Sequence, residues 1–152
     1  MTTRLTFLSH FVICLVVAAG AYFAHTTGVF AAIWNGDTSM MTSLIGLLFV
    51  GTAARLAVLA WRVDGASAET VGNSDSDPSI GHLAERLSVM FGFIGTAVGL
   101  SLQAKALAGG STSFSALATS LFTTACGGVS AAIIAVMTYS LEAGARRTRR
   151  FR

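Results

Sequence analysis

The residues of this chain that are capable of chemistry are mainly hydroxyl side chains, set among small and apolar residues. The sequence contains seven Asp and Glu and three His in total, and none of them falls in residues 87–141. Ion transfer through hydrocarbon normally depends on a titratable or coordinating group. An ion pathway built from these residues alone would therefore lack such a group.

Two bands of small residues have helical spacing. In the first, Gly92, Gly95, Thr96 and Gly99 are three or four residues apart, so a helix would place them on one face, which Gln103 extends by a further turn. The second band consists of Thr119, Ser120, Thr123, Thr124, Gly127, Gly128, Ser130 and Ala131.

Two interpretations of these bands remain open. Membrane helices approach each other through Gly, Ala, Ser and Thr, so the bands are typical of close helix packing. Alternatively, the hydroxyls line an ion pathway. We assign to helix packing the glycines Gly92, Gly95, Gly99, Gly127 and Gly128, and we take as candidates for the pathway Thr96, Thr124, Thr123, Ser120 and Gln103.

The composition places these bands in a membrane. Of 152 residues, 53% are hydrophobic and 11% charged, whereas soluble domains carry about 25% charge. A bilayer span needs about 20 mostly apolar residues. Four such stretches occur, at about 5–33, 40–61, 87–107 and 114–141, and they predict a single all-α membrane domain over residues 1–152.

The connectors between the stretches are short and polar. Residues 63–81 form a loop too small for a domain, and Asp77 followed by Pro78 predicts a helix start before the third stretch. Lys and Arg gather beside the spans on one side only, with Lys105 as the exception, which predicts that both termini are cytoplasmic.

The basic tail, residues 144–152, explains the net charge of +3. We interpret its arginines as anchors for lipid headgroups and not as a nucleic-acid site; they include Arg146, Arg147, Arg149 and Arg150. Arg55 lies within the second span, either as a snorkelling anchor or as an inward-facing cation. His10 and His25 are expected to be packed or interfacial residues and not relay members.

The two bands together carry a family resemblance. The stretch from Phe91 to Leu100 resembles the glycine-threonine signature in the penultimate membrane helix of the MotA/TolQ/ExbB proton-channel family. The stretch from Leu117 to Gly127 resembles the last helix of that family. Four spans with both ends inside are similar to the MotA branch, although the loop at 63–81 is much smaller than in the family.

The resemblance implies a function. Five copies would form a ring in the bacterial inner membrane around single-span partner helices of the MotB, TolR or ExbD kind, and the partner would supply a membrane aspartate. Thr96 and Thr124 match the pore-facing threonines of the family. The complex would convert ion-motive force into mechanical work in the cell envelope.

Two other functions fit the same features. A holin-like pore-forming protein would also be small, multi-spanning and basic at its C-terminus, and a structural scaffold would use the small-residue faces to bind other proteins. An enzyme is not expected, because the sequence has no nucleophile–base pair, metal cluster or phosphate loop. No cofactor or metal is expected, since Cys14 and Cys126 lie in apolar stretches without metal-ligand spacing.

Overall fold

The computed structural model describes residues 5–28, 31, 40–65, 79–110 and 114–150, and its elements are helices. They are α1 (Leu5–Thr26), α3 (Met41–Gly65), α4 (Ser79–Ala108) and α5 (Phe114–Arg150). The described residues contain no strand. The predicted all-α class is therefore confirmed.

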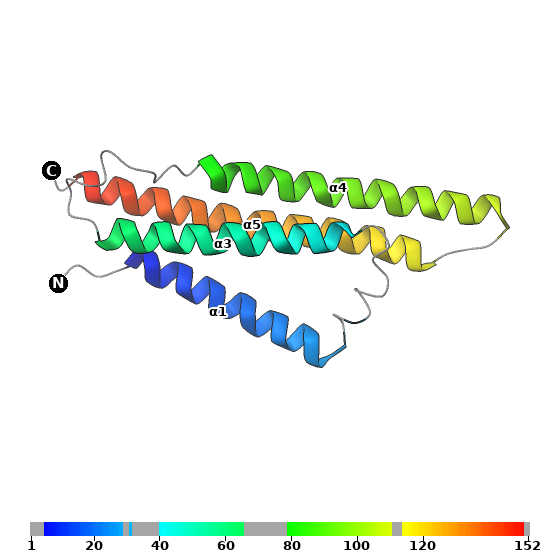
Figure 1. The fold of residues 1–152 in the computed structure, drawn as a ribbon, viewed down its shortest axis with the longest axis horizontal. Helices are drawn as coiled ribbons and strands as arrows, with labels where there is room; N and C mark the ends of the chain where they lie inside the picture. The colour runs from blue at the N-terminus through cyan, green and yellow to red at the C-terminus, as the bar shows by residue number, and fades with distance from the viewer. Residues whose placement is uncertain (1–4, 29–30, 32–39, 66–78, 111–113, 151–152) are drawn as a thin grey trace.

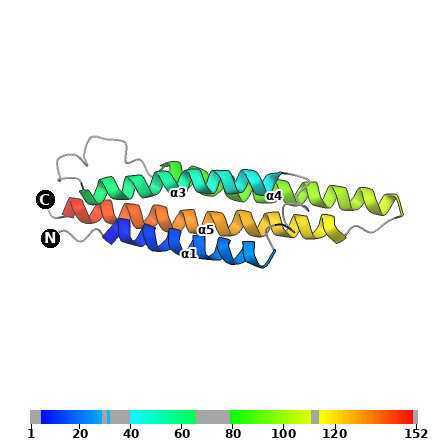
Figure 2. The same cartoon turned by 60° about the horizontal axis from the view of Figure 1, so that its bottom comes forward.

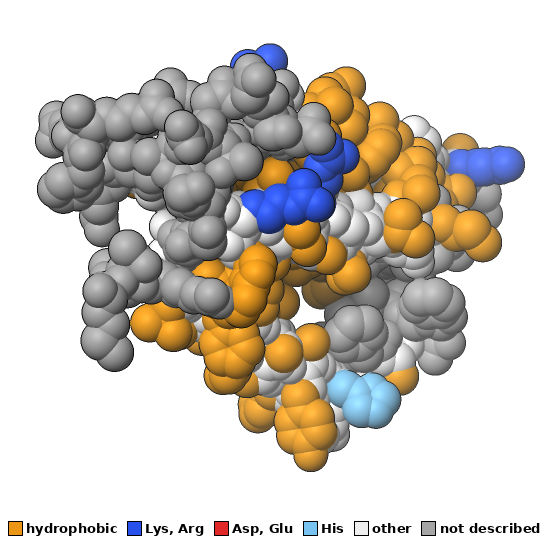
Figure 3. All heavy atoms as spheres, turned by 60° about the vertical axis from the view of Figure 1, so that its left-hand side comes forward, with side chains coloured by type: hydrophobic (Ala, Val, Ile, Leu, Met, Phe, Trp, Pro, Cys, Tyr) orange, Lys and Arg blue, Asp and Glu red, His pale blue; other side chains and the backbone are white. Residues whose placement is uncertain are grey.

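Each of these four helices is long and apolar enough to cross a membrane. The candidate spans are Thr6–Thr26, Met41–Arg62, Ser79–Ala108 and Ser120–Arg146. Large hydrophobic side chains such as Leu47 and Tyr22 are more than two-thirds exposed, and hydrophobic side chains cover much of the described surface in Figure 3. A bilayer is the solvent that accepts such a surface, so the chain is a multi-pass membrane protein.

The helices run alternately up and down the bundle, so that α1 begins at the end where α5 finishes (Figure 1). The most extensive contact joins α4 and α5, and α3 packs against both. Figures 1 and 2 show α1 lying at the edge of the bundle, and in Figure 1 it diverges from α3 along its length. Helix α1 contacts α3 and α5, whereas it makes no contact with α4.

Three helix boundaries differ from the prediction. Helix α1 stops at Thr26 and not near residue 33, because Gly28 follows with a positive φ of 75°. Helix α3 continues to Gly65, inside the predicted loop. Helix α5 continues through the basic tail to Arg150, where strong helix formers and an Arg146–Glu142 contact of 2.9 Å extend it. The predicted start at Asp77 and Pro78 lies outside the described residues.

An apolar core joins three of the helices near the end where α1 begins. Its buried members are Ala53, Leu56, Leu59 and Ala60 of α3, Ala84 of α4, and Ile134, Met137 and Leu141 of α5. Ile13 and Cys14 of α1 pack against this cluster from outside. Cys14 thus behaves as a small hydrophobic residue.

Helices α4 and α5 touch through their backbones. A Cβ added at Gly92 would lie 3.3 Å from the Gly127 Cα, and one added at Gly127 would lie 2.6 Å from the Ser88 carbonyl oxygen. Gly128, the next residue, would have nothing within 4 Å of its Cβ, and it is exposed. Gly128 therefore takes no part in packing within the chain, because one residue along a helix turns the position by about 100°.

We predict that Gly127→Ala lowers the stability of the bundle by about 1–3 kcal/mol, the usual cost of overpacking. The added methyl group would force α4 and α5 apart at the Ser88 carbonyl. Reversible unfolding in detergent, followed by circular dichroism, measures the effect. Gly128→Ala is the matched control and should be neutral or slightly stabilising, because Ala is the better helix former. Equal effects at the two glycines would contradict the packing described above.

Candidate functional site

Two hydroxyls from different helices meet between α4 and α5. Thr96 Oγ1 contacts Thr124 Oγ1, and it also lies 2.9 Å from the Gly92 carbonyl oxygen and 3.3 Å from that of Ser120. Thr124 Oγ1 lies 2.9 Å from the Ser120 carbonyl oxygen. Both threonines are half-buried.

The chemistry of this hydroxyl pair is that of an acceptor. Each hydroxyl has one proton to donate and two lone pairs to accept with. If Thr96 donates to Thr124, then Thr124 donates to the Ser120 carbonyl; if Thr124 donates to Thr96, then Thr96 donates to the Gly92 or the Ser120 carbonyl. In both cases the two protons are used inside the chain. The remaining lone pairs can accept a hydrogen bond from water or from a protonated carboxyl group.

Ser120 and Thr123, in contrast, have almost no exposed surface, at 1% and 0%. The Ser120 hydroxyl donates to the Leu117 carbonyl at 2.8 Å, and the Thr123 hydroxyl donates to the Ser120 carbonyl at 3.0 Å. A side chain enclosed within one chain presents nothing to a pore between chains. The prediction that these two residues line the pathway is therefore corrected, and both belong to the packing of α4 against α5.

The glycines of α4 explain how the hydroxyls come together. Gly92, Gly95 and Gly99 are buried on one face of α4. A Cβ at Gly95 would lie 2.7 Å from the Thr123 hydroxyl oxygen, so the side chain of Thr123 occupies the space that a larger residue would need. This close approach brings the side chains of Thr96 and Thr124 into contact at the margin of the interface.

Gln103 lies on the same face, two turns beyond Thr96. Its side chain is half-buried, and its Oε1 is buried without a hydrogen-bond partner. A buried amide oxygen without a donor is costly in an apolar environment. Gln103 therefore carries a second acceptor along the α4–α5 pair, separate from the threonine contact.

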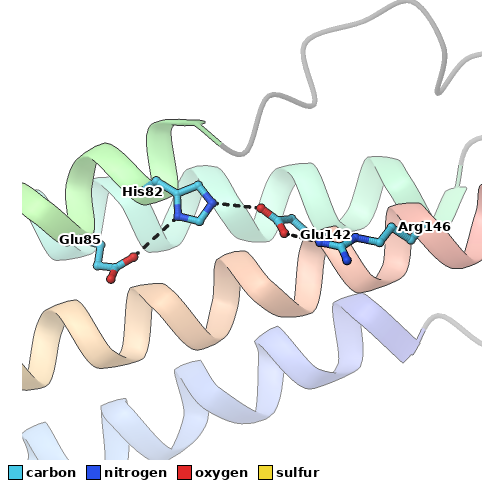
Figure 4. A network of polar contacts seen from close by, with 4 residues as sticks. All are labelled: His82, Glu85, Glu142 and Arg146. Atoms are coloured by element: carbon cyan, nitrogen blue, oxygen red, sulfur yellow. Dashed lines mark hydrogen bonds and ion pairs between the residues drawn. The ribbon is translucent and has the colours of Figure 1, made fainter.

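A charged cluster joins α4 to α5 at the end of the bundle where α5 finishes, and sequence analysis did not identify it (Figure 4). His82 Nε2 lies 3.0 Å from Glu142, whose other oxygen lies 2.9 Å from Arg146 Nη2, while Glu85 lies 3.7 Å from His82 Nδ1. Glu142 and Arg146 are four residues apart, a spacing from which an ion pair on one helix face could have been predicted. The contact between His82 and Glu142, which are 60 residues apart, leaves no local pattern in the sequence.

The remaining charged and histidine residues face in different directions. Arg146 is exposed and paired with Glu142; the side chains of Arg147, Arg149 and Arg150 lie outside the described part. Arg55 is exposed on α3, so it does not face into the bundle. His25 is also exposed.

His10 is fully buried on α1. Its Nδ1 lies 2.8 Å from the Thr6 carbonyl oxygen, which can only accept, so Nδ1 carries the proton and donates. Its Nε2 is then a lone-pair acceptor, and it is buried without a hydrogen-bond partner. This arrangement is that of a packed histidine.

Comparison of the chain with protein-family models, with curated proteins and with solved structures gave no match. The resemblance to the MotA/TolQ/ExbB family therefore stays a prediction.

We predict that His10→Leu leaves the stability unchanged or raises it by about 1 kcal/mol. The change removes a buried acceptor without a partner, and replacing an unsatisfied polar group by an apolar one is neutral or favourable. Thermal unfolding in detergent measures it, with the exposed His25→Leu as control, expected within about 0.5 kcal/mol of the unaltered protein. A loss of several kcal/mol at His10 alone would mean that Nε2 has a partner.

Proposed function

We propose that this chain is the ring-forming subunit of an ion-driven complex in the bacterial inner membrane. Several copies, five by the family resemblance, surround the membrane helices of a single-span partner of the MotB, TolR or ExbD kind. Both termini face the cytoplasm, in keeping with the distribution of Lys and Arg along the sequence. The ion is a proton, and the complex performs no enzymatic reaction.

The observation that carries the proposal is the half-buried contact between Thr96 and Thr124. It offers acceptor lone pairs at the margin of two membrane helices whose common face is otherwise glycine and small side chains. The part of the chain between residues 87 and 141 has no carboxyl or imidazole group that could bind the ion by itself. A carboxyl group supplied by a partner helix would complete the site.

The energy available from ion transfer is consistent with a partner helix that carries the ion and a ring that surrounds it. One elementary charge that crosses 100 mV releases about 2.3 kcal/mol. That energy can rotate or rock a partner helix only if few large side chains hold it in place. Small side chains around Thr96 and Thr124 suit such a contact, whereas interlocked leucines would resist it.

One structural feature disfavours the scaffold alternative. The small-residue face of α4 and that of α5 are in contact with each other, so they are not available to bind other membrane helices. The features of the pore-forming alternative, small size and a basic tail, are shared with the proposed subunit, so an experiment must separate the two.

Native mass spectrometry of the protein in detergent tests the assembly. The chain is co-expressed with a single-span protein that carries an aspartate in its membrane helix, encoded by an adjacent gene. We expect a closed ring that retains partner chains. A ladder of homo-oligomers without the partner, together with membrane leakage when the chain is expressed alone, would support a pore-forming protein and overturn the proposal.

Valine substitutions test the role of the hydroxyls. Thr96→Val and Thr124→Val keep the side-chain shape, and each is expected to lower ion flux through the assembled complex by tenfold or more. Flux is measured with a pH-sensitive dye in proteoliposomes under an imposed potential.

Thr123→Val is the matched control, because that hydroxyl is buried within the chain and donates to its own helix. It should leave the flux within about twofold, a difference in barrier below about 0.5 kcal/mol. If Thr96→Val and Thr124→Val dissociate the ring, or if all three variants conduct equally, the threonines serve packing alone.

A further inference from the structure

Two arginines lie on one flank of α3. Arg55 and Arg62 are seven residues apart, which is two helical turns and about 10 Å along the axis. Trp61 meets Phe7 of α1 in an edge-to-face contact with ring centroids 4.8 Å apart, and Leu56 is buried in the core. By helical geometry, the two arginines therefore lie on the flank of α3 that is turned away from α1.

Both arginines are exposed, and neither has a hydrogen bond or ion pair within the described part of the chain. Two carboxylates have described side chains, Glu85 and Glu142, and both contact His82. Among the side chains that the structure describes, none is an anion that balances Arg55 and Arg62.

The depth of the two arginines in the membrane favours a common position for their guanidinium groups. Arg62 ends the candidate span Met41–Arg62, whereas Arg55 lies two turns inside it. A charge at the centre of a membrane helix costs about 2.5–3.5 kcal/mol, so a position of the Arg55 guanidinium nearer the interface is favoured. That direction is toward Arg62.

On the N-terminal side of Arg55, the same flank of α3 is apolar and is not covered by other helices. Gly51 lies one turn before Arg55, and a Cβ there would have nothing within 4 Å. Leu44, two turns before Gly51, is 46% exposed, and Val58 beside the arginines is 54% exposed. We call the strip formed by Leu44, Gly51, Arg55 and Arg62 the arginine flank.

We propose that the arginine flank binds one anionic phospholipid per chain. The phosphate accepts hydrogen bonds from the guanidinium groups of Arg55 and Arg62, because guanidinium presents paired donors that match phosphate oxygens. One acyl chain lies along Gly51 and Leu44. The occupant is a lipid and not free phosphate, because the flank is part of a span and its lower half offers only apolar surface. This inference does not depend on the proposed ion pathway.

The headgroup contact is tested with phosphatidylglycerol and the protein in detergent, with native mass spectrometry counting the lipids retained per chain. The unaltered protein should retain one, and R55Q/R62Q should bind it at least tenfold more weakly. Arg86→Gln is the control, because Arg86 is exposed on α4 and has no second arginine on its face. Its retention should match that of the unaltered protein.

The acyl-chain contact is tested with two open glycines of the same helix. Gly51→Leu fills the arginine flank and should weaken retention severalfold with both arginines present. Gly46→Leu is the control, since a Cβ there also meets nothing within 4 Å but lies on the other flank.

Three results would overturn the proposal: an equal loss in Arg86→Gln, unchanged retention in Gly51→Leu, or displacement of the lipid by millimolar inorganic phosphate. An equal loss in Arg86→Gln would mean that the lipid is attracted to any arginine on the surface. Unchanged retention in Gly51→Leu, or displacement by phosphate, would mean that the arginines bind the anionic group without the acyl chain.

Discussion

The backbone contact between Gly92 and Gly127 determines how the rest of this bundle is built. With no side chain on either residue, α4 and α5 approach closely enough for the Gly127 position to touch the Ser88 carbonyl. Three further features depend on that distance. The Thr123 side chain fills the space beside Gly95, the hydroxyls of Thr96 and Thr124 meet, and α3 can pack across both helices at once.

The membrane environment accounts for the way polar groups are arranged around this contact. Without water, a hydroxyl must find its acceptor within the protein, and a carbonyl of the preceding helical turn is always within reach. Ser120, Thr123 and Thr124 all use such carbonyls. The described ion pairs, in contrast, gather around His82 and Glu142, at the end of the bundle where α5 finishes. The hydroxyls of the α4–α5 interface thus lie inside the bundle, whereas the described ion pairs lie toward its end.

Sequence periodicity predicted which segments are helices and which faces carry small residues, because spacing along a helix fixes angles about its own axis. It did not predict how each helix is rotated against its neighbour. Ser120 and Thr123 therefore appeared equivalent to Thr124, although the structure buries them completely. Gly128 appeared equivalent to Gly127 for the same reason. The His82–Glu142 pair depends on the register of two antiparallel helices, which no local pattern encodes.

The bundle divides into a tightly packed pair and two helices with different tasks. Helices α4 and α5 use their small faces on each other, so what they offer outward is the margin where Thr96 and Thr124 meet. Helix α3 completes the core and carries exposed arginines on its outer flank. Helix α1 is attached mainly through its first turns, where Phe7 meets Trp61 and Ser9 bonds to Ser140.

The hydroxyls of Thr96 and Thr124 have both donated their protons within the chain, so the pair can accept a hydrogen bond but cannot donate one. The acid from a partner helix that we propose would supply that proton donor at this margin.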